Sequence, residues 1–337
     1  MDLIVEGNGV FLGKHQGRLR VSCQGKTVSE APVIHLQQVI VVDSGVAISS
    51  DVVRTCAEEG IPIHFLTTNG QHVAGLYAAG LNGTVLTRRA QLGAFEDERG
   101  VALARAFVMG KVENQRALVR YMAKYRKEAE PALFEELTLV AAELGDHVQE
   151  AEKISARQVS EVREQLLSVE GRAASHYWGA IKRMIPASLA WPGRETHGAT
   201  DAFNMLLNYG YGILYAQVER ALVLAGLDPY GGFLHADRPG KPSLVLDLIE
   251  EFRQTVVDRT LIGQVNRGFA VERDEQGRLD PSTRKRVAER VLERLESTEL
   301  YEGKRQALRF ILQCQARHLA TFVRREREAY TPFVAGW

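Results

Sequence analysis

The chain has 337 residues and a mass of 37.5 kDa, with 45% hydrophobic and 25% charged residues. This composition is typical of a globular protein and excludes a disordered or low-complexity chain. The 42 Lys and Arg balance the 42 Asp and Glu, so net charge gives no reason to expect a polyanionic partner. No apolar run reaches the roughly 20 residues that span a bilayer, and the first ten residues lack the features of a secretory signal. The three cysteines form no CxxC pair, and we expect a cytoplasmic protein without disulfides or membrane partners.

The first part of the chain has the features of short strands. Segments rich in Val and Ile alternate with Gly, Asn and charged turns, at residues 3–7, 10–14, 18–23, 26–33, 39–43 and 61–66. One helix is predicted among them, capped by Ser49 or Ser50 and ended by Gly60. Asn69-Gly70, between two extended runs, predicts a hairpin turn.

The periodicity of apolar residues changes from about Thr87 onward. Spacings of three and four, typical of amphipathic helices, continue to the C-terminus with few strand-like breaks. We therefore predict an α+β protein with a small β-rich N-terminal domain, residues 1–87, and a larger all-α C-terminal domain, residues 88–337. The histidines of the β-rich domain are interpreted as structural residues: His35, His64 and His72.

Glu170 is the first candidate for chemistry in the helical part. It follows the apolar Val169 and precedes Gly171 and further small residues, which predicts a crowded environment. A carboxylate is costly there unless it is paired or bound to a metal ion. The alternative is an ordinary exposed glutamate on a helix.

His235 is the second candidate. It lies between Gly231-Gly232 and Pro239-Gly240, so we expect it on an irregular segment beside apolar residues. A single histidine in such a place is more often a hydrogen-bonded core residue than a ligand, and both interpretations stay open.

Asp247 and Glu250 form the third candidate. They are three residues apart on a helix predicted over residues 242–253, which places both carboxylates on one face. Leu244, Leu248 and Phe252 recur every four residues, so most of this helix should be buried. Two acids on a buried helix require a cation or a hydrogen-bond donor, whereas a solvated polar face is the alternative.

The three segments together suggest one oxygen-rich site with a single imidazole. Carboxylate oxygens favour Mg²⁺ or Mn²⁺, whereas structural zinc sites favour several Cys or His ligands. Mg²⁺ held by carboxylates is common in phosphoryl transfer. Arg238 and Arg253 each follow a candidate ligand by three residues and could hold phosphate oxygens.

The sequence resembles the CRISPR-associated protein one family, the integrases that insert new spacers into a CRISPR array. The similar stretches are VEGRAASHYW at 169–178, DAFNMLLNYGYGILY at 201–215, DPYGGFLHADRPGKPSLVLDLIEEFR at 228–253 and ILQCQARHLATF at 311–322. The N-terminal part also agrees, in SSDVVRTCAEEGIPIHFL and in TVLTRRAQ at 84–91. The resemblance covers nearly the whole chain.

The resemblance implies a metal site and a reaction. The family's metal ligands correspond to Glu170, His235 and Glu250, with Asp247 as a supporting acid, and they would bind Mg²⁺ or Mn²⁺ in residues 88–337. The implied reaction is attack by the 3′-hydroxyl of a short DNA duplex on a phosphodiester of the array, with no covalent protein intermediate. A stand-alone metal-dependent nuclease for branched or single-stranded DNA is the alternative.

The resemblance also implies binding partners. These are the prespacer duplex and the leader–repeat DNA, contacted through Arg238 and Arg253, the small CRISPR-associated protein two, and a prespacer-processing nuclease. Residues 1–87 would form a homodimer contact. One stretch departs from the family, because a basic, Pro-rich segment is replaced here by the sequence of residues 195–198, which follows Arg194.

Overall fold

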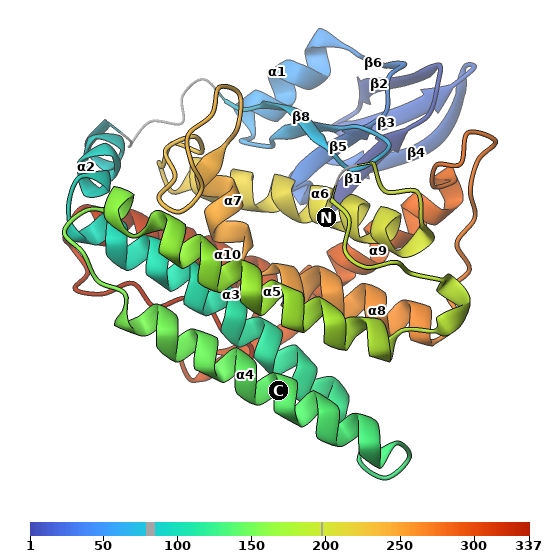
Figure 1. The fold of residues 1–337 in the computed structure, drawn as a ribbon. Coiled ribbons are helices and arrows are strands. Elements are labelled where there is room, and N and C mark those ends of the chain that lie inside the picture. The colour runs from blue at the N-terminus through green and yellow to red at the C-terminus, as the bar shows by residue number, and fades with distance from the viewer. Residues whose placement is uncertain (79–84, 197) are drawn as a thin grey trace.

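The computed structural model describes residues 1–78, 85–196 and 198–337 (Figure 1). It confirms the predicted α+β fold, since strands dominate the first part of the chain and helices the rest. The predicted boundary at residues 87 and 88 follows closely on segment 79–84, which lies outside the described residues, as does His197.

Two four-stranded sheets form the described β-rich region. The first has the order β1-β5-β7-β8 and contains β1 (Asp2–Glu6), β5 (Gln38–Val42), β7 (Ile63–Leu66) and β8 (His72–Leu76). The second has the order β4-β3-β2-β6 and contains β2 (Val10–His15), β3 (Arg18–Cys23), β4 (Lys26–Pro32) and β6 (Val46–Ile48). β5 pairs in parallel with both β1 and β7 and is buried along its whole length, as expected for a strand covered on both faces.

Local signals position the two other predicted features of this region. Helix α1 (Ser50–Glu58) begins at Ser49, whose hydroxyl accepts a hydrogen bond from the Val52 amide. β7 and β8 are antiparallel and joined by a turn that contains Asn69-Gly70, with Gly70 at a φ of 80°. Both the helix cap and the hairpin were therefore predicted correctly. The short strand β6 was not predicted.

The helical region contains a long three-helix layer and a second group of helices around α6 (Figure 1). α3 packs on both α4 and α5. The helices of the described region are α2 (Val85–Phe95), α3 (Glu98–Lys124), α4 (Pro131–Lys153), α5 (Arg163–Met184), α6 (Ala202–Leu224), α7 (Ser243–Ile249), α8 (Arg259–Asn266), α9 (Pro281–Glu296) and α10 (Leu308–Val323). One hairpin interrupts them, formed by β9 (Thr298–Tyr301) and β10 (Lys304–Ala307). Within the described residues, no helix is long and apolar enough to cross a membrane.

Helix α6 lies inside the molecule, and most of its residues are buried. It begins at Asp201, whose carboxylate accepts from the Asn204 amide, and it contacts α7, α9, α10 and strand β8. In Figure 1 it runs between the β-rich region and the other helices. The larger hydrophobic core includes Ile40, Val42 and Leu66 of the first sheet, so the two regions share a core.

The helix predicted over residues 242–253 is regular only in its first part. α7 ends at Ile249, residues 250–252 form a turn, and a π-helical segment (η4, Arg253–Asp258) leads into α8. The predicted burial is confirmed, since Leu244, Leu248 and Phe252 are all fully buried. The irregular turn lies where the two neighbouring acids, Glu250 and Glu251, have partners in different parts of the molecule. Such π-helical segments are frequent at functional sites.

Candidate functional site

Glu170 lies at the edge of the buried face of α5. Leu166, Val169 and Ala173 of that face are fully buried, whereas the Glu170 side chain is 22% exposed. The neighbouring Gly171 is not required by packing, because a methyl group there would meet no atom within 4 Å. The helix therefore holds the Glu170 carboxylate beside the core and leaves one side of it open.

Lys111 of α3 joins Glu170 to Glu250. Its ammonium group forms an ion pair with Glu170 and a second, 2.8 Å long, with Glu250 Oε2. Burial alone would lower the pKa of Lys111, but the two carboxylates outweigh burial and raise this pKa. A single cationic group thus lies between two carboxylates that are 80 residues apart in the chain.

Glu250 is almost fully buried and ionised. Burial alone would raise the pKa of Glu250. The neighbouring Arg253, Lys111 and His235 outweigh that effect and lower this pKa to about 2. The Arg253 Nε atom is 3.2 Å from Glu250 Oε1. The site consequently keeps a negative charge at Glu250 over the whole physiological pH range.

His235 is held by Asp247, the supporting acid. Its Nδ1 lies 2.7 Å from Asp247 Oδ1, and Asp247 also accepts hydrogen bonds from the backbone amides of Phe233, Leu234 and His235. In the tautomer that donates from Nδ1 to Asp247, the free lone pair of the imidazole is on Nε2. Gly232 makes this packing possible, because a Cβ there would lie 2.6 Å from Ser243 Cβ.

Two arginines, one of them the Arg253 that is paired with Glu250, lie over one tyrosine ring. Arg253 and Arg194 lie 4.5 and 5.4 Å from the ring centroid of Tyr211. The Tyr211 hydroxyl and that of Tyr177, 2.7 Å away, donate to the buried Asp258. Burial raises the pKa of Asp258 to about 6 against the opposing effect of these hydrogen bonds. Tyr211 is thus a core residue that supports the two guanidinium groups.

Glu251 faces away from this site, although it neighbours Glu250 in the chain. Its carboxylate accepts hydrogen bonds from the Tyr330 hydroxyl, the Phe333 amide and the Gln315 side chain. Burial raises the pKa of Glu251 to about 7. This acid therefore fastens the C-terminal segment to the core.

The predicted site residues come together only in part. Glu170 and Glu250 meet at one ammonium group, and His235 is close enough to Glu250 to affect its pKa. Within the part of the chain that the structure describes, the only three metal-binding side chains with ligand atoms all within 4.8 Å of one another belong to a different cluster. Arg238 is exposed on the loop after His235.

Sequence reasoning missed Lys111 and the role of Arg194. Lys111 lies in the middle of a regular helix, and its charge among apolar neighbours was the one signal that could have identified it. Arg194 follows Trp191, directly before the divergent stretch, and donates hydrogen bonds to Asn204 and Asn208 of α6.

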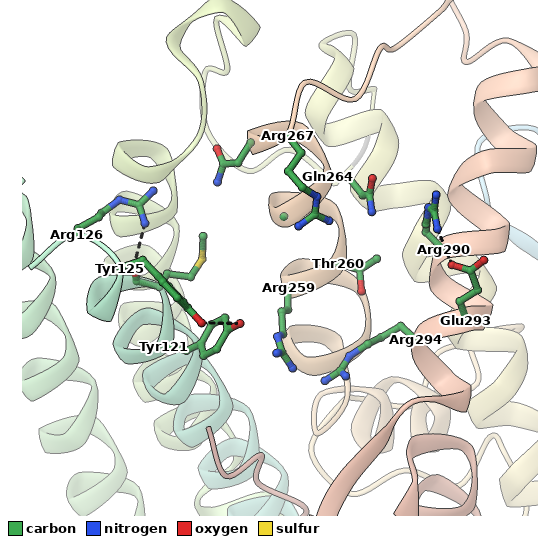
Figure 2. A pocket seen from close by; sticks show the side chains of 13 residues that line it. Tyr121, Tyr125, Arg126, Arg259, Thr260, Gln264, Arg267, Arg290, Glu293 and Arg294 are labelled. Atoms are coloured by element: carbon green, nitrogen blue, oxygen red, sulfur yellow. Dashed lines mark hydrogen bonds and ion pairs between the residues drawn. The ribbon is translucent and has the colours of Figure 1, made fainter. Parts of the chain in front are cut away.

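A second cationic feature is an open cavity of about 830 Å³ between α3, α8 and α9 (Figure 2). Its lining contains five arginines, Arg126, Arg259, Arg267, Arg290 and Arg294. Glu293 is the one acid of that lining, and Tyr121 and Tyr125 provide aromatic rings. This surface is called the arginine cavity below. Its positive charge suits an anionic ligand.

Solved structures with the same fold are casposase and Cas1 proteins. A casposase bound to an integration product matches with a TM-score of 0.82 and 22% identity, over 98% of this chain and 92% of that one. A chain of a Cas6-RT-Cas1–Cas2 complex matches with a TM-score of 0.79 and 20% identity, over 99% of this chain and 36% of that longer chain. At these identities the likeness shows the fold.

The sequence comparisons identify the family. The family model described as CRISPR associated protein Cas1 matches residues 3–293. A CRISPR-associated endonuclease Cas1 of Archaeoglobus fulgidus is 37% identical over 348 aligned residues, which cover 100% of both chains. This chain therefore belongs to the Cas1 family, and the resemblance seen in the sequence is confirmed.

Proposed function

We propose that this protein is a metal-dependent DNA integrase and endonuclease that inserts short duplexes into a CRISPR array. The observation that carries the proposal is the convergence of Glu170 and Glu250 on one ammonium group. Similar proteins support it: the relative from Archaeoglobus fulgidus is named an endonuclease, and the casposase was solved with an integration product.

The donor atoms present fit a divalent cation. Two carboxylates and one imidazole form an oxygen-rich set suited to Mg²⁺ or Mn²⁺. The Lys111 ammonium group occupies a point at which both carboxylates form ion pairs with one cation. Glu170, His235 and Glu250 would hold the ion, which when bound would polarise the target phosphate and stabilise the leaving oxygen.

The remaining side chains have separate tasks. Asp247 directs the free lone pair of His235 to Nε2. Arg253 and Arg194, supported by Tyr211, would bind non-bridging phosphate oxygens by charge-assisted hydrogen bonds. Arg238, exposed on the loop after His235, would contact the DNA backbone further from the metal site. The attacking group is the 3′-hydroxyl of the incoming DNA, so no protein nucleophile is needed.

We further propose that the arginine cavity contacts DNA phosphates. Each phosphate contact contributes about one unit to the slope of log affinity against log salt concentration. Arg267→Ala should therefore reduce that slope by roughly one for a duplex without a defined sequence. An unchanged slope would exclude Arg267 from the DNA interface.

The proposed partners follow from the fold neighbours and from exposed apolar residues. A neighbour of this fold was solved in a complex with Cas2, which supports the small CRISPR-associated protein two as a partner. In the β-rich region the side chains of Val28 and Ile34 are 66% and 82% exposed, which is compatible with a homodimer contact there. A prespacer-processing nuclease stays a prediction of the sequence.

The proposal is tested by strand transfer with Glu170→Gln. Labelled duplex, leader–repeat DNA and Mn²⁺ should give joined products with the unaltered protein and none with the variant. Glu164→Gln is the matched control, because Glu164 is exposed on the same helix. Duplex affinity and the circular dichroism spectrum should be unchanged in both variants. Normal joining by Glu170→Gln would refute the assignment, and nicks without joining in the unaltered protein would favour the stand-alone nuclease.

A further inference from the structure

Three buried ionisable side chains meet where the β-rich region contacts α6. His64 of β7, His72 of β8 and Glu219 of α6 place one ligand atom each within 4.8 Å of the others. His64 Nδ1 is 3.2 Å from His72 Nε2, which is 3.1 Å from Glu219 Oε2. His64 is completely buried, and the side chains of His72 and Glu219 are at most 10% exposed. We call this group the His–His–Glu cluster.

The backbone around the cluster is closely packed, so the three side chains are held in place. A Cβ on Gly212 of α6 would lie 1.6 Å from the carbonyl oxygen of Gly70, in the β7–β8 turn. Gly70 has a φ of 80°, and a Cβ at this position would lie 2.5 Å from the Cα atom of Tyr209. Glu219 follows Gly212 by seven residues, two turns further along the same face of α6. The contact between hairpin and helix therefore brings Glu219 to His72.

Hydrogen bonding within the protein does not satisfy the cluster. Both short contacts involve the same atom, His72 Nε2, which can donate one hydrogen or accept one, but cannot do both. Among the described atoms, Glu219 Oε2 is buried and accepts no well-aligned hydrogen bond, although it lies 3.1 Å from His72 Nε2. Unpaired buried polar atoms are rare in native proteins and require an explanation, such as a bound ion.

The protonation state of the cluster suits a cation. Burial lowers the pKa of His64 to about 3 and that of His72 to about 4, so both imidazoles are neutral and carry lone pairs. Burial raises the pKa of Glu219 to about 7. Arg220 lies near enough to contribute to the lowered pKa of His64, and its charge opposes a cation. A divalent ion would supply the cationic partner that a buried, ionised Glu219 requires.

We propose that His64, His72 and Glu219 supply three ligands to a Zn²⁺ ion that fastens the β7–β8 hairpin to α6. Ligand atoms about 2.0–2.1 Å from a tetrahedral Zn²⁺ lie roughly 3.3–3.4 Å apart, close to the His64–His72 and His72–Glu219 contacts, while His64 and Glu219 lie within 4.8 Å of each other. Two imidazoles and one carboxylate favour Zn²⁺ over Mg²⁺. The site shares no residue with the Glu170–Glu250 pair, and the proposal does not depend on the proposed function.

The test measures metal binding by the full chain in buffer saturated with Mg²⁺. After EDTA treatment and dialysis, calorimetric titration should show one Zn²⁺ per chain, and Co²⁺ loading should give the intense visible absorption of a tetrahedral site. Glu219→Gln should weaken Zn²⁺ binding by at least about 100-fold, because even outer-shell changes cost 10- to 100-fold. Glu170→Gln is the control and should retain this site.

Two results would overturn the proposal. One is Zn²⁺ binding that persists in Glu219→Gln and disappears in Glu170→Gln, since the ion would then occupy the carboxylate pair. The other is the absence of stoichiometric Zn²⁺ and of the Co²⁺ absorption in the unaltered protein, which decides the matter even where the variant does not fold. In that case the cluster is a buried histidine pair. Zn²⁺ should also raise the melting temperature of the unaltered protein but not that of Glu219→Gln.

Discussion

Replacement of Asp247 by asparagine tests the link between the loop and the helix that position His235. Asp247 accepts four hydrogen bonds, two at each carboxylate oxygen. Oδ2 serves the amides of Phe233 and Leu234, and Oδ1 serves the amide and the ring of His235. Asparagine has nearly the same shape but only one accepting oxygen, so two donors lose their acceptor unless the His235 ring changes tautomer and accepts from the new amide.

The expected cost follows from those two hydrogen bonds. A hydrogen bond to a charged group contributes about 1.5–3 kcal/mol, so the free energy of unfolding should fall by about 3–6 kcal/mol. If the new amide nitrogen faces His235, the imidazole must accept at Nδ1 and carry its hydrogen on Nε2. That tautomer cannot bind a metal ion at Nε2, and Mn²⁺ affinity should fall by about 10- to 100-fold.

Three measurements check this prediction. Urea denaturation gives the free energy of unfolding, calorimetry with Mn²⁺ gives the affinity, and ¹⁵N NMR of the histidine rings reports the tautomer. Asp237→Asn is the matched control, because Asp237 is exposed on the same loop. A variant with unchanged Mn²⁺ affinity and an unfolding free energy within about 1 kcal/mol of the unaltered protein would refute the reasoning, because that is less than one such hydrogen bond.

Three further predictions follow from other contacts. Lys111→Met should destabilise the protein by about 3 kcal/mol in EDTA, because two carboxylates lose their shared cation. In thermal unfolding, Mn²⁺ should restore part of that loss. An equal loss of stability with and without Mn²⁺ would contradict this. Burial raises the pKa of Asp258 in the folded protein from 3.8 to about 6, so the native state binds a proton more tightly than the unfolded state. Stability should therefore fall by up to about 3 kcal/mol as pH rises from about 4 to 6. Asp258→Asn should remove that fall from the pH dependence of stability measured in urea. Gly212→Ala should lower the free energy of unfolding, measured in urea, by about 3 kcal/mol, because its Cβ would overlap Gly70. The control Gly179→Ala, in open space on α5, should raise it by about 0.5–1 kcal/mol.

Features determined by a few neighbouring residues could be predicted from the sequence. The Ser49 cap, the Asn69-Gly70 turn and the burial of Leu244 each depend on local chemistry or on a regular period, and all three are confirmed. β6 escaped prediction because a three-residue strand has no measurable alternation. The irregular turn after Ile249 depends on partners from distant segments, which no local pattern contains.

The sequence could nominate residues for the candidate site but not their arrangement. Glu170, His235 and Glu250 stood out because charged or polar side chains occurred in apolar surroundings. Lys111 contacts acids 59 and 139 residues further along the chain, so its role depends entirely on tertiary packing. The arginine cavity has the same origin, since its side chains come from three separate helices. The prediction that His64 is structural could not include Glu219, because α6 brings that side chain to the cluster from a distant part of the chain.

The opposite orientations of Glu250 and Glu251 affect how mutational data on this segment should be interpreted. Alanine at either position would abolish activity in a simple screen, and the two variants would look alike. At 250 the variant would lose a proposed metal ligand and would leave the buried Lys111 and Arg253 with one acid fewer. At 251 the C-terminal segment would lose the acceptor of the Tyr330 hydroxyl and of the Phe333 amide and would open more readily. Protease sensitivity of the C-terminal segment distinguishes the two, although only one peptide bond separates them.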